Sequence, residues 1–287
     1  MNSSSKARRV TLTRAYAVVL DIALVLLLVF SGLASAAIEP FQHTTASVSN
    51  LRPLPITPAS WAFSIWGLIY AWLLYCVILW TVMAWRAPDL AAVTLSSGPF
   101  FFATFALVGT SLWLLLWDSA LLWWSFVDLV LIWGLLVGLV TSLVKSRKRY
   151  SDIRSRAWHI AGVLAVNGFA TYGAWVTVAT FLNLGMAVVY ESNQNLMLTS
   201  EILLAVLMAL SYLVFALEIR YSELFRDVLT LHFVFLWAAV AILSNKEEKS
   251  RTLIVQLGFI ITSEILMATT KVLLCVDAIR VRQVEEW

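Results

Sequence analysis

Residues 56–72, ITPASWAFSIWGLIYAW, lead from a polar loop into an apolar segment and carry three tryptophans, a tyrosine and a phenylalanine. Neighbouring residues of a helix lie about 100° apart around its axis, so Phe63, Trp66 and Tyr70 share one face. Apolar residues extend this face along the helix: Leu73, Val77 and Trp80. Trp61 and Trp72 fall on the opposite side. We expect the first face to point toward other helices and the second toward lipid or the membrane interface.

The whole chain has the composition of an integral membrane protein. It has 287 residues, of which 61% are hydrophobic and 13% charged, and its mean hydropathy is +0.86. A helix needs about 20 apolar residues to cross a bilayer. Eight stretches satisfy this requirement: 16–38, 61–85, 98–117, 119–144, 158–189, 195–217, 226–244 and 252–277. The sequence therefore predicts an all-α, polytopic helix bundle with about eight transmembrane helices.

Most connections between these stretches are short, and the longest runs from Glu39 to Ser60. It contains four prolines and several serines and threonines, which suits an ordered cap over one membrane face. A tight turn is expected at Asp118 and Ser119, between the third and fourth stretches.

Basic residues predict how the bundle is oriented. With the N-terminus inside, fifteen lysines and arginines lie in inner segments and four in outer segments, and inner loops of membrane proteins are enriched in these residues. We therefore expect both termini to be cytoplasmic, with residues 1–15 as an N-terminal cytoplasmic segment. The largest basic group, at 145–156, is expected to face solvent or lipid headgroups. Nucleic acid is not expected as a partner.

The fifth stretch contains a second aromatic face. In NGFATYGAWVTVATFLNLGMAVVY, residues 167–190, one narrow stripe collects small and polar-edged side chains: Gly168, Tyr172, Trp175, Ala179, Asn183 and Met186. The small residues allow a neighbouring helix to approach. The polar groups need partners inside a bilayer, which another helix, water or a ligand would supply. Trp113, on the third stretch, lies too deep for an interfacial belt. Solid packing of these rings and a ligand pocket both remain open.

These aromatic residues resemble a known family. Pro58, Trp61, Phe63, Trp66 and Tyr70, a tryptophan-bearing third helix, and then a second group occur in the order and at the intervals of the tryptophan-rich sensory protein family. The second group is Tyr172, Trp175, Ala179, Leu182 and Asn183. The family also contains the mitochondrial translocator protein, or peripheral benzodiazepine receptor.

The resemblance implies a five-helix core over residues 16–190, with a cavity beneath the loop that joins its first two helices. Such a cavity would hold flat apolar molecules of the tetrapyrrole or sterol class, and no cofactor is required. The implied ligand-binding residues are Trp61, Phe63, Trp66, Tyr70, Trp113, Tyr172, Trp175, Ala179 and Asn183.

Three features depart from the family pattern. Phe63 and Trp66 are one residue closer than the corresponding family positions. Thr110 replaces an asparagine that usually lies one turn before the tryptophan of the third helix. Residues 191–287 add three helices that the five-helix family lacks. The chain is therefore expected to be a divergent, enlarged relative with a C-terminal extension.

Charged residues also occur within the apolar stretches, where they are costly and often functional. Asp128 and Glu264 are the most central. Each is either a protonated carboxyl group bonded to another helix or part of a proton or ion path. Lys271 shares a helix face with Glu264 and could bracket a polar path with it, but lies near the helix end, where we expect its amine to reach the headgroups.

The sequence contains no pattern that indicates an enzyme. His43, His159 and His232 are scattered, and there is neither a metal-ligand spacing nor a phosphate-binding loop. The favoured function is a membrane receptor or carrier for a hydrophobic small molecule. The alternatives are a proton- or ion-coupled transporter that uses Asp128 and Glu264, and a non-catalytic subunit of a larger membrane complex that docks through 191–287. Besides membrane lipids, a second copy of the chain or a membrane-complex subunit is a candidate partner.

Overall fold

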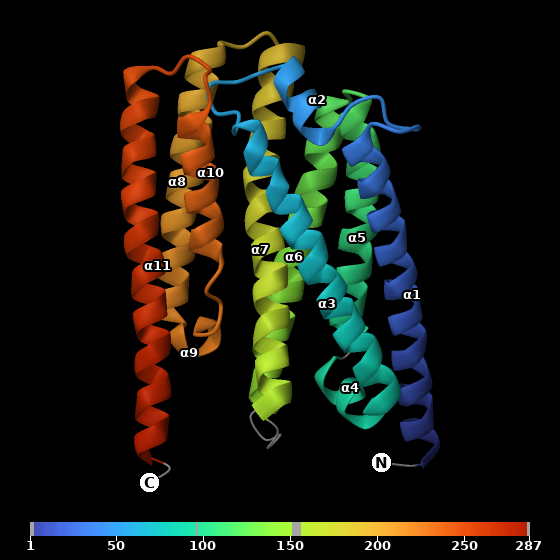
Figure 1. Cartoon of the computed structure of the whole chain (residues 1–287). Helices are drawn as coiled ribbons and strands as arrows, with labels where there is room; N and C mark the ends of the chain where they lie inside the picture. The colour runs from blue at the N-terminus through green and yellow to red at the C-terminus, as the bar shows by residue number, and fades with distance from the viewer. Residues whose placement is uncertain (1–2, 96, 151–155, 286–287) are drawn as a thin grey trace.

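Long helices run side by side through the computed structural model, which describes residues 3–95, 97–150 and 156–285 (Figure 1). All regular elements in these residues are helical. Both ends of the chain lie at one end of the bundle, and the 39–60 segment lies at the other. The chain is thus a multi-pass membrane protein. The side of the membrane on which the termini lie stays a prediction, and residues 151–155 of the basic group lie outside the described residues.

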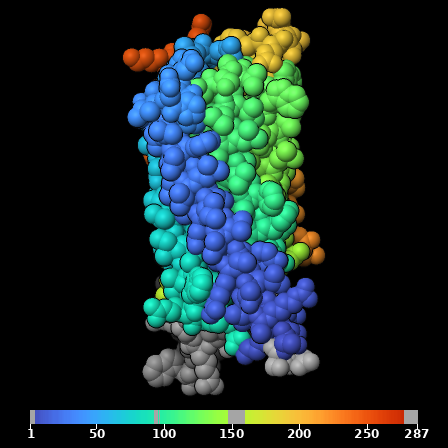
Figure 2. Space-filling model, turned by 90° about the vertical axis from the view of Figure 1, so that its right-hand side faces the viewer, coloured from blue at the N-terminus to red at the C-terminus, as the bar shows by residue number. Residues whose placement is uncertain are grey.

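Seven of the described helices are long and apolar enough to cross a membrane. Five of them form the N-terminal part of the bundle: α1 (Ser3–Ala36), α3 (Ile65–Arg86), α5 (Ser97–Asp118), α6 (Leu122–Tyr150) and α7 (Arg156–Met186). A short helix, α4 (Pro88–Thr94), lies between α3 and α5. Figure 2 shows α1 running diagonally across one face of the bundle. In the most apolar part of the α7 span, 72% of the residues are buried, so this helix is the centre of the bundle.

The predicted turn between α5 and α6 is confirmed. Helix α5 ends at Asp118 and α6 begins at Leu122. Ala120 has φ 54°, a left-handed conformation that commonly closes a helix. The amide of Leu121 donates to the carbonyl oxygen of Leu116, 3.0 Å away. This bond satisfies one of the backbone acceptors that a helix end leaves free.

The C-terminal extension begins after a π-helical turn, η2 (Ala187–Glu191). It comprises α8 (Leu196–Arg220), α9 (Ser222–Phe225), α10 (Leu231–Ser244) and α11 (Arg251–Glu285). The stretch expected at 226–244 is shorter than predicted. Helix α10 has 14 residues, about 21 Å in length, and does not by itself span a hydrocarbon core of about 30 Å. Residues 226–230 are not helical.

The 39–60 segment forms the expected cap. It contains a short helix, α2 (Thr45–Leu51), and ends in a 3₁₀ turn, η1 (Ser60–Ser64), which leads into α3. Apolar residues of the cap are buried against the bundle below: Phe41, Val48, Leu54 and Ile56. The cap is therefore packed onto the helices and is not a free loop.

The closest contact between α3 and α7 differs from the prediction. Trp72, expected to face lipid or the interface, lies across Gly168 of α7 and donates from Nε1 to the carbonyl oxygen of Leu164, 2.9 Å away. A Cβ atom on Gly168 would come within 2.6 Å of Trp72 Cδ1. The small residue does allow close approach, but the approaching group is an indole ring.

This contact predicts the effect of Gly168→Ala. The added methyl group would push the indole away from Leu164, and overpacking of this kind costs about 1–3 kcal/mol. We expect a lower midpoint of thermal unfolding in detergent. Gly162→Ala on the same helix is the matched control, because a Cβ atom there meets nothing within 4 Å. Equal midpoints for the two variants would contradict the described contact.

Candidate functional site

Trp66 lies at the centre of a buried aromatic cluster. Its ring is 5.5 Å from Tyr70 and from Trp113, and 6.3 Å from both Tyr172 and Trp175, measured between centroids. These rings come from α3, α5 and α7. The predicted inward face of α3 is confirmed, since Trp66 and Leu73 are buried on it. We call these five rings, with Phe63, the Trp66 cluster.

Three rings of the cluster form a stack that Trp117 extends beyond it. Tyr70 and Trp66 are inclined by 20°, Trp66 and Trp113 by 34°, and Trp113 and Trp117 by 23°. Trp175 instead meets the stack edge-on, at 86° to Trp66, and Phe63 meets Trp175 at 89°. The cluster therefore presents flat faces in one direction and ring edges in another.

The rings of the cluster contact each other. Four of the best-formed cavities among the described residues are not lined by Trp66, Trp113 or Trp175. The expected cavity beneath the cap is not among them. The assignment of these residues to ligand binding stays a prediction, and binding there would require the rings to separate.

Polar groups edge the cluster, and most have partners. Asn183 Oδ1 accepts hydrogen bonds from Ser125 Oγ at 2.5 Å and from Trp113 Nε1 at 3.5 Å, and Asn183 Nδ2 donates to the carbonyl oxygen of Ala179. Thr110, which replaces the family's asparagine, is hydrogen-bonded to the hydroxyl group of Tyr172. The exception is Trp175: its indole N–H is buried and has no hydrogen-bond partner among the residues that the structure describes.

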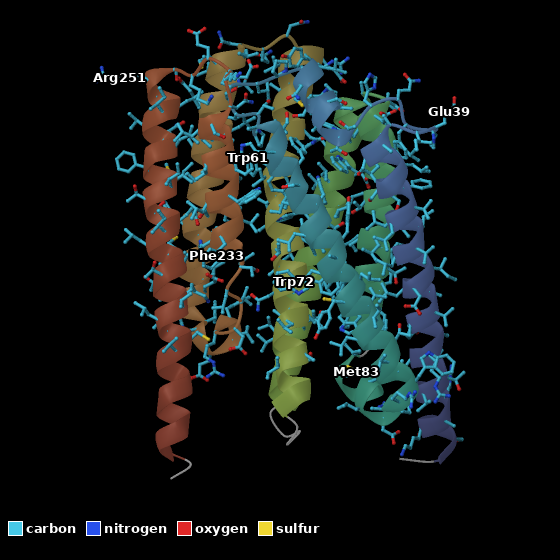
Figure 3. The ribbon with its side chains drawn as sticks, in the orientation of Figure 1. Glu39, Trp61, Trp72, Met83, Phe233 and Arg251 are labelled. Atoms are coloured by element: carbon cyan, nitrogen blue, oxygen red, sulfur yellow. The ribbon has the colours of Figure 1, made fainter. Side chains whose placement is uncertain are left out.

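Trp61 is not brought into the cluster. Its side chain is 45% exposed, and its ring lies 4.8 Å from that of Trp237 on α10 (Figure 3). The helical periodicity correctly placed Trp61 opposite Trp66. The ligand role that the family pattern implied for Trp61 therefore has no support from proximity to the other rings.

The cap is fixed above the cluster by hydrogen bonds to the helix ends. The backbone amides of Gln42 and His43 donate to the carboxylate of Asp118 at 3.0 and 2.8 Å. The indole of Trp117 donates to the carbonyl oxygen of Thr45 at 3.1 Å. Because Trp117 also stacks on Trp113, it links the cap to the cluster.

Asp128 and Glu264 lie in different parts of the bundle. The carboxyl group of Asp128, on α6, faces Gly109 of α5, and its Oδ2 atom has no hydrogen-bond partner. Glu264, on α11, contacts Ser211 of α8 and His232 of α10. The structure does not join them in one contact network.

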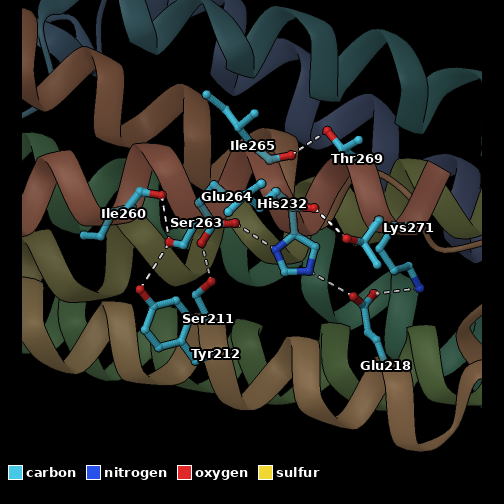
Figure 4. A network of polar contacts seen from close by, with 12 residues as sticks. Ser211, Tyr212, Glu218, His232, Ile260, Ser263, Glu264, Ile265, Thr269 and Lys271 are labelled. Atoms are coloured by element: carbon cyan, nitrogen blue, oxygen red, sulfur yellow. Dashed lines mark hydrogen bonds and ion pairs between the residues drawn. The ribbon is translucent and has the colours of Figure 1, made fainter. Parts of the chain in front are cut away.

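Glu264 instead belongs to a buried chain of four charged or titratable residues in the extension (Figure 4). His232 Nδ1 lies 2.7 Å from Glu264 Oε2, and His232 Nε2 lies 2.9 Å from Glu218 Oε2. Lys271 Nζ lies 3.5 Å from Glu218 Oε1 and donates to the carbonyl oxygen of Phe225. We call these four residues the charge chain. All four are at most 3% exposed.

The charge chain corrects the prediction for Lys271 and adds His232 and Glu218 to the polar path. Lys271 does not reach the headgroups; it is buried and paired with Glu218. Glu264 and Lys271 do lie along one polar path, as their shared helix face suggested, and His232 and Glu218 fill the gap between them. Glu218 was missed because it lies one residue beyond the expected end of its helix.

Among the described residues, no group of three or more histidine, cysteine, aspartate or glutamate side chains could hold a metal ion.

Comparison with known proteins gives one match. A family model described as TSPO-like protein matches residues 17–272. The match covers α3, α5 and α7, which carry the Trp66 cluster, and also most of the extension. The searches of curated proteins and of solved structures gave no match to this chain.

The anchoring of the cap predicts the effect of Asp118→Ala. The variant removes the acceptor of two charge-assisted hydrogen bonds, each worth about 1.5–3 kcal/mol. We expect the amides of Gln42 and His43 to exchange with deuterium at least about tenfold faster.

Asp89→Ala is the control for this measurement. Asp89 is exposed and pairs with Lys6 at the opposite end of the bundle. Exchange that is unchanged in Asp118→Ala, or accelerated equally in Asp89→Ala, would show that Asp118 does not hold the cap.

Proposed function

The chain belongs to the TSPO-like protein family, and from this premise we propose that it is a membrane receptor or carrier that binds a flat hydrophobic molecule within the Trp66 cluster. A tetrapyrrole or a sterol is the expected class of ligand. The proposal assigns the chain no catalytic role and no required cofactor.

One observation carries the proposal: the indole N–H of Trp175 is buried in an aromatic cluster without an acceptor. A buried donor that lacks its hydrogen bond costs about 1–3 kcal/mol. A ligand that carries a carboxylate, carbonyl or hydroxyl oxygen would remove this cost. Tetrapyrroles and sterols combine such an oxygen with a flat apolar body.

The ring stack supports a flat body as the other half of the ligand. The rings of Trp66 and Trp113 are inclined by 34° and belong to different helices, α3 and α5. Separating these two helices slightly would admit a planar molecule between them. Stacking on each indole would contribute about 0.5–1.5 kcal/mol beyond the burial of apolar area. The cap, held by Asp118 and Trp117, would close over the ligand.

The structure bears differently on the two alternative functions, transport and docking. A transporter with one path through both Asp128 and Glu264 is not favoured, because the two groups have separate neighbours. Docking of residues 191–287 to a second copy of the chain or to another membrane subunit stays a prediction, and lipid covers the exposed apolar faces of the helices.

Trp66→Ala and Trp175→Phe test the proposal by different routes. The first removes the centre of the stack, whereas the second keeps the ring and removes only the N–H donor. With protoporphyrin IX added to the purified full chain, we expect each variant to bind about tenfold more weakly. The measurement is the shift of the porphyrin Soret band during a titration.

Trp124→Ala is the matched control, because Trp124 is 66% exposed and lies outside the cluster. Thermal unfolding of each variant separates lost binding from lost folding. Unchanged porphyrin affinity in a folded Trp175→Phe variant would remove the observation on which the proposal depends.

A further inference from the structure

A second candidate site lies between the N-terminal helices and the extension. A cavity of about 210 Å³ opens between α6, α7, α8 and α10. Its walls are mostly apolar. The residues that line it include Trp133, Gly173, Thr177, Val214, Glu218 and Phe235. An apolar cavity of about 150 Å³ holds benzene. This cavity therefore has room for one aromatic ring and a short chain.

Glu218 gives the cavity a single acidic group. Its side chain is only 2% exposed in the bundle and belongs to the cavity wall. Glu218 Oε2 is bonded to His232, whereas Oε1 forms only an ion pair, with Lys271 Nζ at 3.5 Å, and this amine also donates to the carbonyl oxygen of Phe225. A buried carboxylate oxygen with open acceptor capacity favours a donor in the cavity.

The charge chain must hold one more proton than neutral imidazole supplies. Both ring nitrogens of His232 lie within hydrogen-bond distance of a carboxylate oxygen, and each contact needs a proton between its two atoms. Neutral imidazole carries only one N–H. With the second proton present, Glu218, His232, Glu264 and Lys271 together have no net charge; without it, the buried group has one excess negative charge.

Glu218 from α8 and Glu264 from α11 are the titratable groups that act on His232. Lys271 from α11 acts on Glu218 and lies near Asp227 and Cys275. Asp227 also acts on Lys271, but it is paired with Arg226 at 3.5 Å, so the two together add no net charge to this count. The ring of Phe215 covers His232, with its centroid 5.4 Å away. A buried excess charge is costly, so the loss of the second proton must be balanced by the arrival of another cation.

We infer that the cavity binds a small lipophilic amine in its cationic form, that the ammonium group pairs with Glu218, and that binding releases the second proton of His232 to solvent. The charge of the buried group is the same before and after this exchange. The aromatic part of the amine would pack against Trp133 and Phe235. A neutral molecule of the same shape fills the cavity but cannot replace the proton.

This inference does not depend on the Trp66 cluster, and its test uses a different ligand. Phenethylamine and its neutral isostere, phenethyl alcohol, are titrated into the purified full chain by calorimetry at neutral pH. Two buffers with different ionisation enthalpies report proton release. We expect release of about one proton per amine bound. The alcohol should bind about ten- to hundredfold more weakly and release no proton.

Two variants locate the effect. Glu218→Gln removes the acidic group and should abolish the preference for the amine over the alcohol. Glu201→Gln on the same helix is the matched control, because Glu201 bonds to Ser250 away from the cavity and should behave as the unaltered chain does. Val214→Phe fills the cavity and leaves the charge chain intact, so it should lose binding of both compounds even if Glu218→Gln does not fold.

Three results would overturn the inference. The first is amine binding without proton release in the unaltered chain. The second is amine binding that persists in folded Val214→Phe. The third is a bound phospholipid, detected by native mass spectrometry, that the amine does not displace. The cavity would then bind a lipid acyl chain.

Discussion

The arrangement of the extension depends on the side chain of Asn167, in the centre of α7. Asn167 Nδ2 donates to the carbonyl oxygen of Asp227 at 2.6 Å, and its Oδ1 accepts from the amide of Leu229 at 2.8 Å. The backbone oxygen of Asn167 also accepts a bond from the hydroxyl group of Thr230. Non-helical backbone inside a bilayer needs such partners. One asparagine thereby permits the break between α9 and α10.

Helix α10, which follows this break, contacts two other parts of the bundle. Near its start, His232 is held between Glu218 and Glu264. Near its end, the carbonyl oxygen of Ala241 accepts the amide of Ala59 in the cap. The same short helix thus contacts the charge chain and the cap. The sequence-based division at residue 190 stays a prediction, but the bonds of Asn167 to Leu229 and Thr230, and that of Ala59 to Ala241, connect the chain on either side of it.

Helical periodicity predicted the direction of side chains better than the residues that they contact. The inward face of Trp66 and the outward face of Trp61 follow from about 100° per residue and are both found. The pairing of Lys271 with Glu218 could not be predicted, because it joins helices whose relative depth depends on the break after α9. The contact of Trp72 with Gly168 has the same cause: a helical wheel gives an angle, but the neighbouring helix decides whether lipid or protein lies there.

The same limit explains why the sequence left solid packing and a ligand pocket both open. Aromatic side chains that converge from three helices satisfy one another as readily as they satisfy a flat ligand, since both use the same stacked and edge-on geometries. A ligand that separates Trp66 from Trp113 loses their mutual contact and regains a similar one on each face. Stacking therefore gains about one ring contact, worth about 0.5–1.5 kcal/mol, which is less than the cost of association. The surplus must come from a contact that the closed cluster lacks, and the unpartnered N–H of Trp175 is the group in the cluster that offers one.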